Sequence, residues 1–383
     1  MGAPRKILSV QGDMESILAA AVAFVLALTQ AQEIDIVFAG DAMMHTGQLE
    51  AARRGNGVYD YSDCFSAIAP YISAADYAVV NLETPVAKAP YSGYPQFNAP
   101  DSYPRALAAA GFDLFLTANN HTLDRRDRGL CRTVATLDSL GLPHIGTYTD
   151  SADRAERLPF VADIRGFRVG FVNYTYGTNG FTVSSGALVD YISADRIRQD
   201  IARARRAGAE IIVAAMHWGE EYTLTPVAYE KQWARFLEKE GVDIIMGGHP
   251  HVVQPMELRE NSTTGKPMFL TYSHGNFISN MMTRDTRGGL LTRVTLARDD
   301  KGAAYVKEAA YKLIFTVPPT DTSFRPSPSV KDAPVGERYG FVRPNYMVLP
   351  ADSVTGAWQG RAREFVASAL SAFRNNIGPV TRE

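Results

Sequence analysis

The stretch GVDIIMGGHPHVV, from Gly241 to Val253, joins an apolar run to two glycines and two histidines one residue apart. The apolar residues Val242–Met246 predict a buried strand, which stops at the glycine pair. His249 and His251 follow at once, and a metal site is one explanation of this arrangement. A polar turn with solvent-facing imidazoles is the other explanation, and this stretch alone does not decide between the two.

The composition is that of an ordinary globular protein. The 383 residues are 46% hydrophobic and 21% charged, and the net charge is −2. This length suits one large domain or two ordinary ones. Because Lys and Arg are scattered, the basic stripe of a nucleic-acid-binding protein is missing, and we expect no nucleic-acid partner. Cys64 and Cys131 form no C-x-x-C motif, which leaves either one disulfide or two free thiols.

The first residues are typical of an export signal. Two basic residues precede an apolar run of about 12 residues, Ile17–Leu28, which is short for a membrane span. Thr29 and Ala31 supply the small side chains of a cleavage site. We therefore expect residues 1–31 to be a signal peptide or an N-terminal anchor. The protein is then expected to be exported, as a periplasmic, extracellular or membrane-anchored protein.

From Ile34 onwards the sequence alternates between strand-like and helix-like segments. Apolar runs such as IDIVFAG (34–40) predict strands, and SADRIRQDIARARRAG (193–208) predicts a helix that begins at a serine cap. This alternation predicts an α/β fold. The last predicted strands, within 267–317, are typical of antiparallel pairing and favour mixed sheets or a sandwich of sheets.

The composition changes after Val317, where proline, serine and charged residues accumulate. We therefore expect one domain over residues 32–317. Residues 318–383 are expected to form a C-terminal extended segment followed by a single amphipathic helix that docks on its own domain.

Polar side chains gather where the predicted strands end, which is where sites lie in α/β folds. These residues are Asp41, His45, Asn81, Glu83, Asn119, Asn120, His121, His217, His249, His251, His274 and Asn276. Each alone has an ordinary explanation, such as a helix cap, a turn or a packed core histidine. Together, oxygen and imidazole ligands without a thiolate predict a site for Mn, Fe or Zn, and disfavour a structural zinc site.

Six motifs follow one another along the chain: GDAMMH (40–45), NLETPV (81–86), ANNHTLD (118–124), HWGEEY (217–222), GGHPHVV (247–253) and YSHGNFI (272–278). In this order they resemble the CapA family of bacterial capsule-biosynthesis proteins, which is associated with poly-γ-glutamate capsules. That family is similar in fold to calcineurin-like metallophosphoesterases. The resemblance therefore implies a four-layer α-β-β-α sandwich of metallophosphoesterase type with mixed sheets and a two-metal centre.

The resemblance also implies ligands for a first metal. Asp41 and His251 would hold this ion, with His45 as a further ligand, and Glu83 would stand where the phosphoesterases have a bridging carboxylate. Two features depart from the phosphoesterase pattern. Their Asp-x-His motif is replaced by a longer spacing between Asp41 and His45, and their bridging aspartate is replaced by a glutamate.

Asn120, His217 and His249 would hold a second metal, and His121 would act as general acid or oxyanion stabiliser. Gly247–Gly248 would let the backbone turn close to the ions. Two divalent ions, Mn, Fe or Zn, about 3.5–4 Å apart would polarise a phosphoryl or carbonyl oxygen and activate water.

Substrate contacts are expected from Glu221, His274 and Asn276. In the stretch YSGYPQF, Tyr91, Tyr94 and Phe97 would either form an aromatic clamp, if the substrate were a nucleotide, or pack a loop.

The resemblance predicts an exported two-metal hydrolase that acts in the biosynthesis of poly-γ-glutamate capsule or another surface polymer. Its substrate would be an anionic polymer or a phosphoester, cleaved at an amide or phosphoester bond, and membrane-bound capsule synthesis proteins would be partners. Two alternatives remain open. One is a non-catalytic polymer-binding or export subunit of a capsule synthesis complex, and the other is a secreted metal-dependent phosphatase or nucleotidase.

Overall fold

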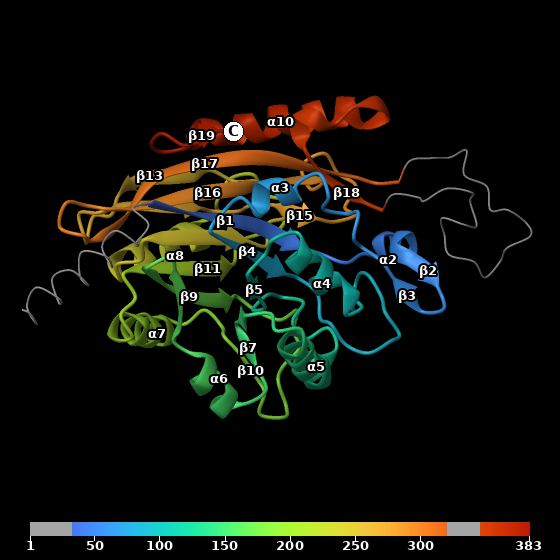
Figure 1. Cartoon of the computed structure of the whole chain (residues 1–383), viewed down its shortest axis with the longest axis horizontal. Coiled ribbons are helices and arrows are strands. Elements are labelled where there is room, and N and C mark those ends of the chain that lie inside the picture. Colours follow the sequence, from blue (N-terminus) through green and yellow to red (C-terminus); the bar gives the residue numbers. More distant parts are fainter. Residues whose placement is uncertain (1–32, 320–344) are drawn as a thin grey trace, which may run out of the picture.

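Two stacked β-sheets organise the protein (Figure 1). The computed structural model describes residues 33–319 and 345–383, so the predicted signal peptide or anchor and much of the predicted extended segment lie outside these ranges. The first sheet consists, in spatial order, of β18 (Met347–Pro350), β17 (Ala304–Val317), β16 (Gly288–Arg298), β1 (Glu33–Ala42), β4 (Tyr77–Leu82), β5 (Leu114–Leu116) and β6 (His144–Ile145). The second consists of β13 (Met256–Glu260), β14 (Pro267–Thr271), β12 (Ile244–Gly248), β11 (Ile211–His217), β9 (Phe167–Thr175) and β8 (Phe160–Ile164).

Both sheets are mixed, as predicted. Strands β1, β4, β5 and β6 run parallel, whereas β16, β17 and β18 continue the first sheet in antiparallel order. In the second sheet β9, β11, β12 and β14 are parallel, and the edge strands β8 and β13 are antiparallel. The short strand β15 (Asn276–Ile278) pairs with the end of β1.

Hydrophobic side chains define four layers. Phe38 and Val79 of the first sheet pack in one core with Phe171 and Val213 of the second sheet. Helices α3 (Ala69–Ile72) and α4 (Ser102–Ala109) cover the other face of the first sheet. Helices α7 (Ala194–Arg206) and α8 (Ala228–Lys239) cover the outer face of the second. The predicted α-β-β-α sandwich is therefore confirmed.

The predicted C-terminal helix is present as α10 (Gln359–Ala372) and packs along β17 (Figure 1). Its Phe365 and Ala369 belong to the same core as the two sheets. Because β18 also pairs with β17, the chain after residue 345 completes the sandwich. The helix thus docks on its own domain, as expected.

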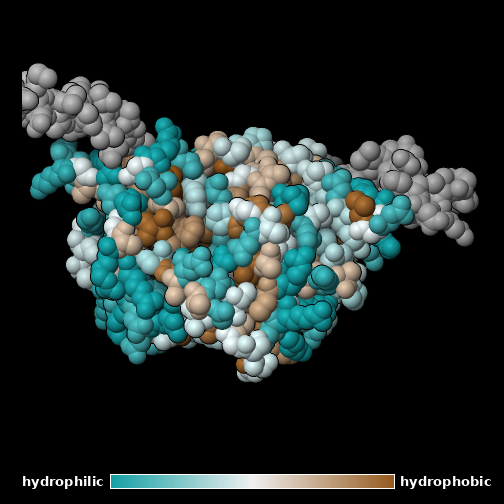
Figure 2. Space-filling view, turned by 60° about the horizontal axis from the view of Figure 1, so that its bottom comes forward, coloured by the Kyte–Doolittle hydropathy of each residue, from teal (hydrophilic) through white to brown (hydrophobic). Residues whose placement is uncertain are grey.

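Cys64 and Cys131 are both free thiols, which settles the alternative left open above. Among the helices of residues 33–319 and 345–383, none combines the length and apolarity needed to cross a bilayer. The face shown in Figure 2 is mostly polar, with small hydrophobic clusters scattered over it.

Candidate metal centre

The cluster of predicted ligands lies where parallel strands of both sheets end. Asp41 in β1 lies opposite Asn81 in β4, and His217 in β11 lies opposite Gly248 in β12. The carboxyl ends of the two strand pairs therefore face one another across the sandwich. As predicted, polar side chains from the ends of several strands lie together here. They are Asp41, Glu83, Asn120, His217, His249 and His251.

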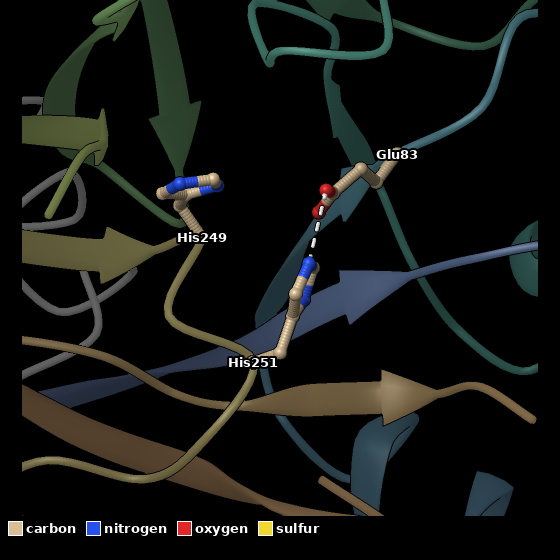
Figure 3. A group of neighbouring side chains, drawn as sticks. All are labelled: Glu83, His249 and His251. Atoms are coloured by element: carbon tan, nitrogen blue, oxygen red, sulfur yellow. Dashed lines mark ion pairs between the residues drawn. The ribbon is translucent and has the colours of Figure 1, made fainter. Parts of the chain in front are cut away.

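Within residues 33–319 and 345–383, two groups of three side chains have the geometry to hold a metal ion. One is Asp41, Glu83 and His217, and the other is Glu83, His249 and His251; in each group the ligand atoms lie within 4.8 Å of one another. All five side chains are buried. Glu83 belongs to both groups, which is the position expected of a bridging carboxylate. Figure 3 shows Glu83 and His251 pointing toward each other, with the His249 ring beside them.

Two buried atoms of this cluster have no hydrogen-bond partner, namely Glu83 Oε1 and His249 Nδ1. Glu83 Oε1 lies 3.7 Å from His217 Nε2 and 3.7 Å from His251 Nε2. A buried acceptor without a partner costs about 1–3 kcal/mol, and more when it is charged. Divalent cations bound at this point would offset that cost. The donor set and its unpartnered atoms therefore fit two divalent ions.

In the metal-free protein, burial shifts the pKa values of the side chains in the cluster. Burial, reinforced by the charge of Asp41, raises the pKa of Glu83 well above its usual value. Burial also lowers the pKa of His217 to about 3. Burial by itself would raise the pKa of Asp41, but the hydrogen bond and charge of His251 outweigh it, so the pKa of Asp41 is lowered. Because a bound cation favours the ionised carboxylate, metal uptake at Glu83 is coupled to proton release.

The contacts agree only partly with the predicted division of ligands between two ions. His251 Nδ1 lies 3.2 Å from Asp41 Oδ2, and His217 Nε2 lies 2.9 Å from Asn120 Oδ1, as that division requires. Asp41, however, falls in one three-ligand group with His217, and His249 falls in the other with His251. The assignment of His249 and His251 to different ions stays a prediction.

The glycine pair acts differently from what the sequence suggested. A Cβ on Gly247 would lie 1.9 Å from Tyr272 O, and a Cβ on Gly248 would lie 2.8 Å from Asp41 Oδ1. The glycines therefore permit close approach, and the turn itself is formed by His249 (φ 98°) and His251 (φ 57°). Positive φ is unfavourable for residues with a side chain and is concentrated at functional sites, where the surrounding structure holds it.

His45 belongs to neither three-ligand group. It caps helix α2 (Thr46–Ala52), and its Nδ1 accepts a hydrogen bond from the Asn280 backbone N–H at 3.3 Å. Its ring also packs against Phe97, with the centroids 5.2 Å apart. The longer spacing from Asp41 thus places the imidazole in a structural position, and only Nε2 is left for a metal.

His121 is held by Asp124, a residue whose role the sequence analysis missed. Its Nδ1 lies 2.8 Å from Asp124 Oδ2, which also accepts the Phe97 backbone N–H at 2.7 Å. With Nδ1 engaged in this way, Nε2 is the nitrogen available to a substrate. In the sequence, Asp124 lies three residues after His121. Within one turn of the chain, this spacing brings the two side chains to the same side of the backbone, and it could have indicated the pair. Phe97 is fully buried against the His121 ring, so it does not form the predicted aromatic clamp.

Glu221 is the predicted substrate residue that lies at the surface. Its charge adds to the effect of burial in raising the pKa of Glu83 and of Tyr176, so it lies near enough to the cluster to act on it electrostatically. The Tyr176 ring packs against His249 at a tilt of 45°, with ring centroids 4.6 Å apart, and the ring centroids of Tyr222 and His251 lie 6.3 Å apart. Both tyrosines are half-exposed and form the rim of the site, and Tyr176 was not recognised from the sequence.

The predicted substrate contacts of His274 and Asn276 do not fit their positions. His274 is buried, with Nδ1 3.1 Å from Gly247 O and Nε2 2.8 Å from Thr292 Oγ1. Asn276 is also fully buried, and its Oδ1 lies 3.0 Å from His251 Nδ1. Both residues therefore support the backbone and ligands of the cluster from behind.

The loop that carries Glu221 rests on a buried glutamate in α8. Glu230 Oε2 accepts the Val227 backbone N–H at 2.6 Å, and a Cβ on Gly219 would lie 2.6 Å from the Glu230 carboxyl carbon. The other oxygen, Oε1, and Gln254 Oε1 are both buried acceptors without a partner. Burial raises the pKa of Glu230 to about 7, despite its hydrogen bond from Val227.

Replacing Glu230 with glutamine is expected to stabilise the protein at pH 8 and to flatten its stability between pH 5 and pH 8. A carboxyl whose pKa is raised contributes stability that is fully present below about pH 4.5 and is lost as the pH rises through about 7. The difference amounts to at most about 3 kcal/mol. Thermal unfolding at both pH values measures it, with Glu220→Gln as the exposed control. An unchanged pH slope in Glu230→Gln would contradict the prediction.

Fold and cluster together define a class: a four-layer α-β-β-α protein with a candidate two-metal centre at the carboxyl ends of its strands. Residues 35–281 match the family model described as bacterial capsule synthesis protein PGA_cap. The chain belongs to this family, which confirms the resemblance drawn from the motifs.

Two curated relatives have similar sequences. The chain is 26% identical over 286 residues to the capsule biosynthesis protein CapA of Bacillus anthracis, an alignment covering 71% of this chain and 66% of that protein, just under two thirds of its length. It is 24% identical over 274 residues to the PGA biosynthesis protein CapA of Bacillus subtilis (strain 168), an alignment that covers 69% of this chain and 68% of that protein. A solved structure of a putative 5'-nucleotidase from Staphylococcus aureus aligns with a TM-score of 0.44 at 13% identity, covering 88% of this chain and 58% of that one.

Proposed function

We propose that this protein is a metal-dependent hydrolase that acts on a capsule or surface polymer of the poly-γ-glutamate type. One observation carries the proposal: Glu83 is shared by two groups of potential ligands, and its buried Oε1 has no hydrogen-bond partner. The family and the names of its relatives support a role in polymer synthesis. Export, and association with membrane-bound capsule synthesis proteins, are parts of the same proposal.

The side chains around the cluster have distinct tasks in such a hydrolase. Bound divalent ions would supply Lewis-acid polarisation and water activation. His121 would donate a proton through Nε2 to the leaving group, since its Nδ1 is held by Asp124. The Asp124 carboxylate would keep the imidazole in one orientation and stabilise its protonated form.

We favour an amide over a phosphoester as the bond that is cleaved. The rim is formed by the phenols of Tyr176 and Tyr222 and the carboxylate of Glu221. The ion pairs recorded for the cluster join histidines to carboxylates. Phosphate sites commonly use an arginine that binds two oxygens at once, and none of these ion pairs involves an arginine.

The test is polymer cleavage by the full chain loaded with Mn²⁺. Poly-γ-glutamate is incubated with the protein and its length is followed by size-exclusion chromatography, in parallel with hydrolysis of p-nitrophenyl phosphate. Shortening of the polymer is the expected result. If only the phosphate ester is hydrolysed, the proposal is wrong and the protein is a phosphatase.

A second candidate, a non-catalytic polymer-binding subunit, is favoured by His45, whose Nδ1 is taken by Asn280. Polymer binding without cleavage of either substrate would support it.

A further inference from the structure

We infer that Asn276 is a positioning residue that sets the tautomer and the direction of the His251 ring in the metal centre. The inference rests on the proposed metal-dependent function and adds to it a residue that touches neither substrate nor ion.

The orientation of the Asn276 amide is defined by its partners. Its Nδ2 donates to Thr286 O at 2.8 Å, with longer contacts of 3.5 Å to His251 O and Met281 Sδ. Oδ1 is therefore the atom that faces His251 Nδ1, at 3.0 Å. An amide oxygen only accepts hydrogen bonds, so Nδ1 must carry the proton. The lone pair of the imidazole is then on Nε2, which lies 3.7 Å from Glu83 Oε1 (Figure 3).

Asp41 does not make this contact redundant. Its Oδ2 also lies 3.2 Å from His251 Nδ1, but the same oxygen accepts the His249 backbone N–H at 3.2 Å. Asp41 is itself one of the potential ligands. When its carboxylate binds a cation, Asn276 is the acceptor that still holds the Nδ1–H of His251. Partners of this kind that orient ligating histidines typically change metal affinity 10- to 100-fold.

The backbone gives Asn276 little freedom to move. In the pairing of β15 with β1, Asn276 lies directly opposite Asp41. The Asp41 backbone N–H also donates to Gly275 O at 3.0 Å. The positioning residue and a ligand are therefore joined by the sheet, and the distance between them is set by main-chain geometry.

A matched control is offered by Asn179. Its Oδ1 accepts a hydrogen bond from Asn120 Nδ2 at 3.3 Å, so it too is an amide bonded to a predicted ligand. Unlike Asn276, it is exposed, and water can replace it.

The test compares Asn276→Leu with Asn276→Asp by calorimetric titration of the full chain with Zn²⁺ and with Mn²⁺. Both variants lose the hydrogen bond to Thr286 O, but only aspartate keeps an acceptor for His251 Nδ1. We expect Asn276→Leu to bind about 10- to 100-fold more weakly than wild type. Asn276→Asp is expected to stay much closer to wild type, and Asn179→Ala to match it.

Several results would overturn the inference. Wild-type affinity in Asn276→Leu would do so, as would an equal loss in both Asn276 variants, because that pattern marks a purely structural role. An equal loss in Asn179→Ala would show that the effect is not specific to Asn276. If Asn276→Leu does not fold, Asn276→Ser replaces it, since the shorter hydroxyl cannot reach His251. Wild-type protein that binds no metal would instead contradict the proposed function.

Discussion

Replacing Glu83 with glutamine is expected to abolish the binding of both metal ions while the metal-free protein stays folded. Wild type is expected to hold two equivalents of Mn, Fe or Zn, one for each ligand group. Glutamine has nearly the same shape but no negative charge, and it cannot act as an anionic bridge. Because Glu83 takes part in both groups, a single substitution affects both ions.

The metal-free fold should tolerate this substitution for a physical reason. Burial and the charge of Asp41 raise the pKa of Glu83, so the ionised side chain is disfavoured in the metal-free protein. A neutral amide at this position removes the cost of ionising a buried group. We therefore expect an unfolding temperature in the presence of a chelator that is equal to that of wild type or higher.

Elemental analysis and thermal unfolding with and without chelator measure both effects. Glu221→Gln is the control, because it changes the same functional group at the exposed rim and should keep both ions. Two equivalents of metal in Glu83→Gln would disprove the bridging role. Equal unfolding temperatures of wild type with and without added metal would argue against a folded metal centre altogether.

Replacing His121 with alanine is expected to reduce hydrolysis about 10²- to 10⁴-fold, the usual contribution of a general acid. Metal content should not change, because His121 belongs to neither ligand group. Asp124→Asn should also lower the rate, since a neutral amide stabilises the protonated imidazole less than a carboxylate does.

The turnover of poly-γ-glutamate, measured beside metal content, separates these roles. Asp127→Asn is the control, because the Asp127 carboxylate binds Ser184, away from His121. A loss of metal in His121→Ala would make it a ligand and not a proton donor. Full activity in His121→Ala would show that His121 is not the general acid.

Much of the fold follows from local patterns. The run IDIVFAG predicts β1, and the alternation of apolar strands with capped helices predicts an α/β protein. The approach of Asp41 and Asn81 was also predictable, because polar residues at the ends of neighbouring parallel strands meet at one edge of a sheet. The approach of His217 depends on how the second sheet stacks on the first.

What sequence reasoning could not supply depends on long-range geometry. His274 forms hydrogen bonds with Gly247 and Thr292 and does not contact substrate. This arrangement depends on the packing of β16 behind the site. The positive φ of His249 and His251 is likewise imposed by contacts with distant residues and not by local propensity. Asp124 was the exception, since its spacing from His121 was visible in the chain.

The pairing of β1 with β16 limits how this protein can be divided into modules. The region that matches the family model ends at residue 281, but β16 begins at Gly288 and pairs with β1 from Glu33 to Ala39. A fragment ending at 281 would leave the strand that carries Asp41 with an open edge, whose free N–H and C=O groups invite pairing with other chains. The segment after the motifs therefore belongs to the same folded unit as the site, and a chimera joined at that boundary would replace the strand that pairs with β1 on one side.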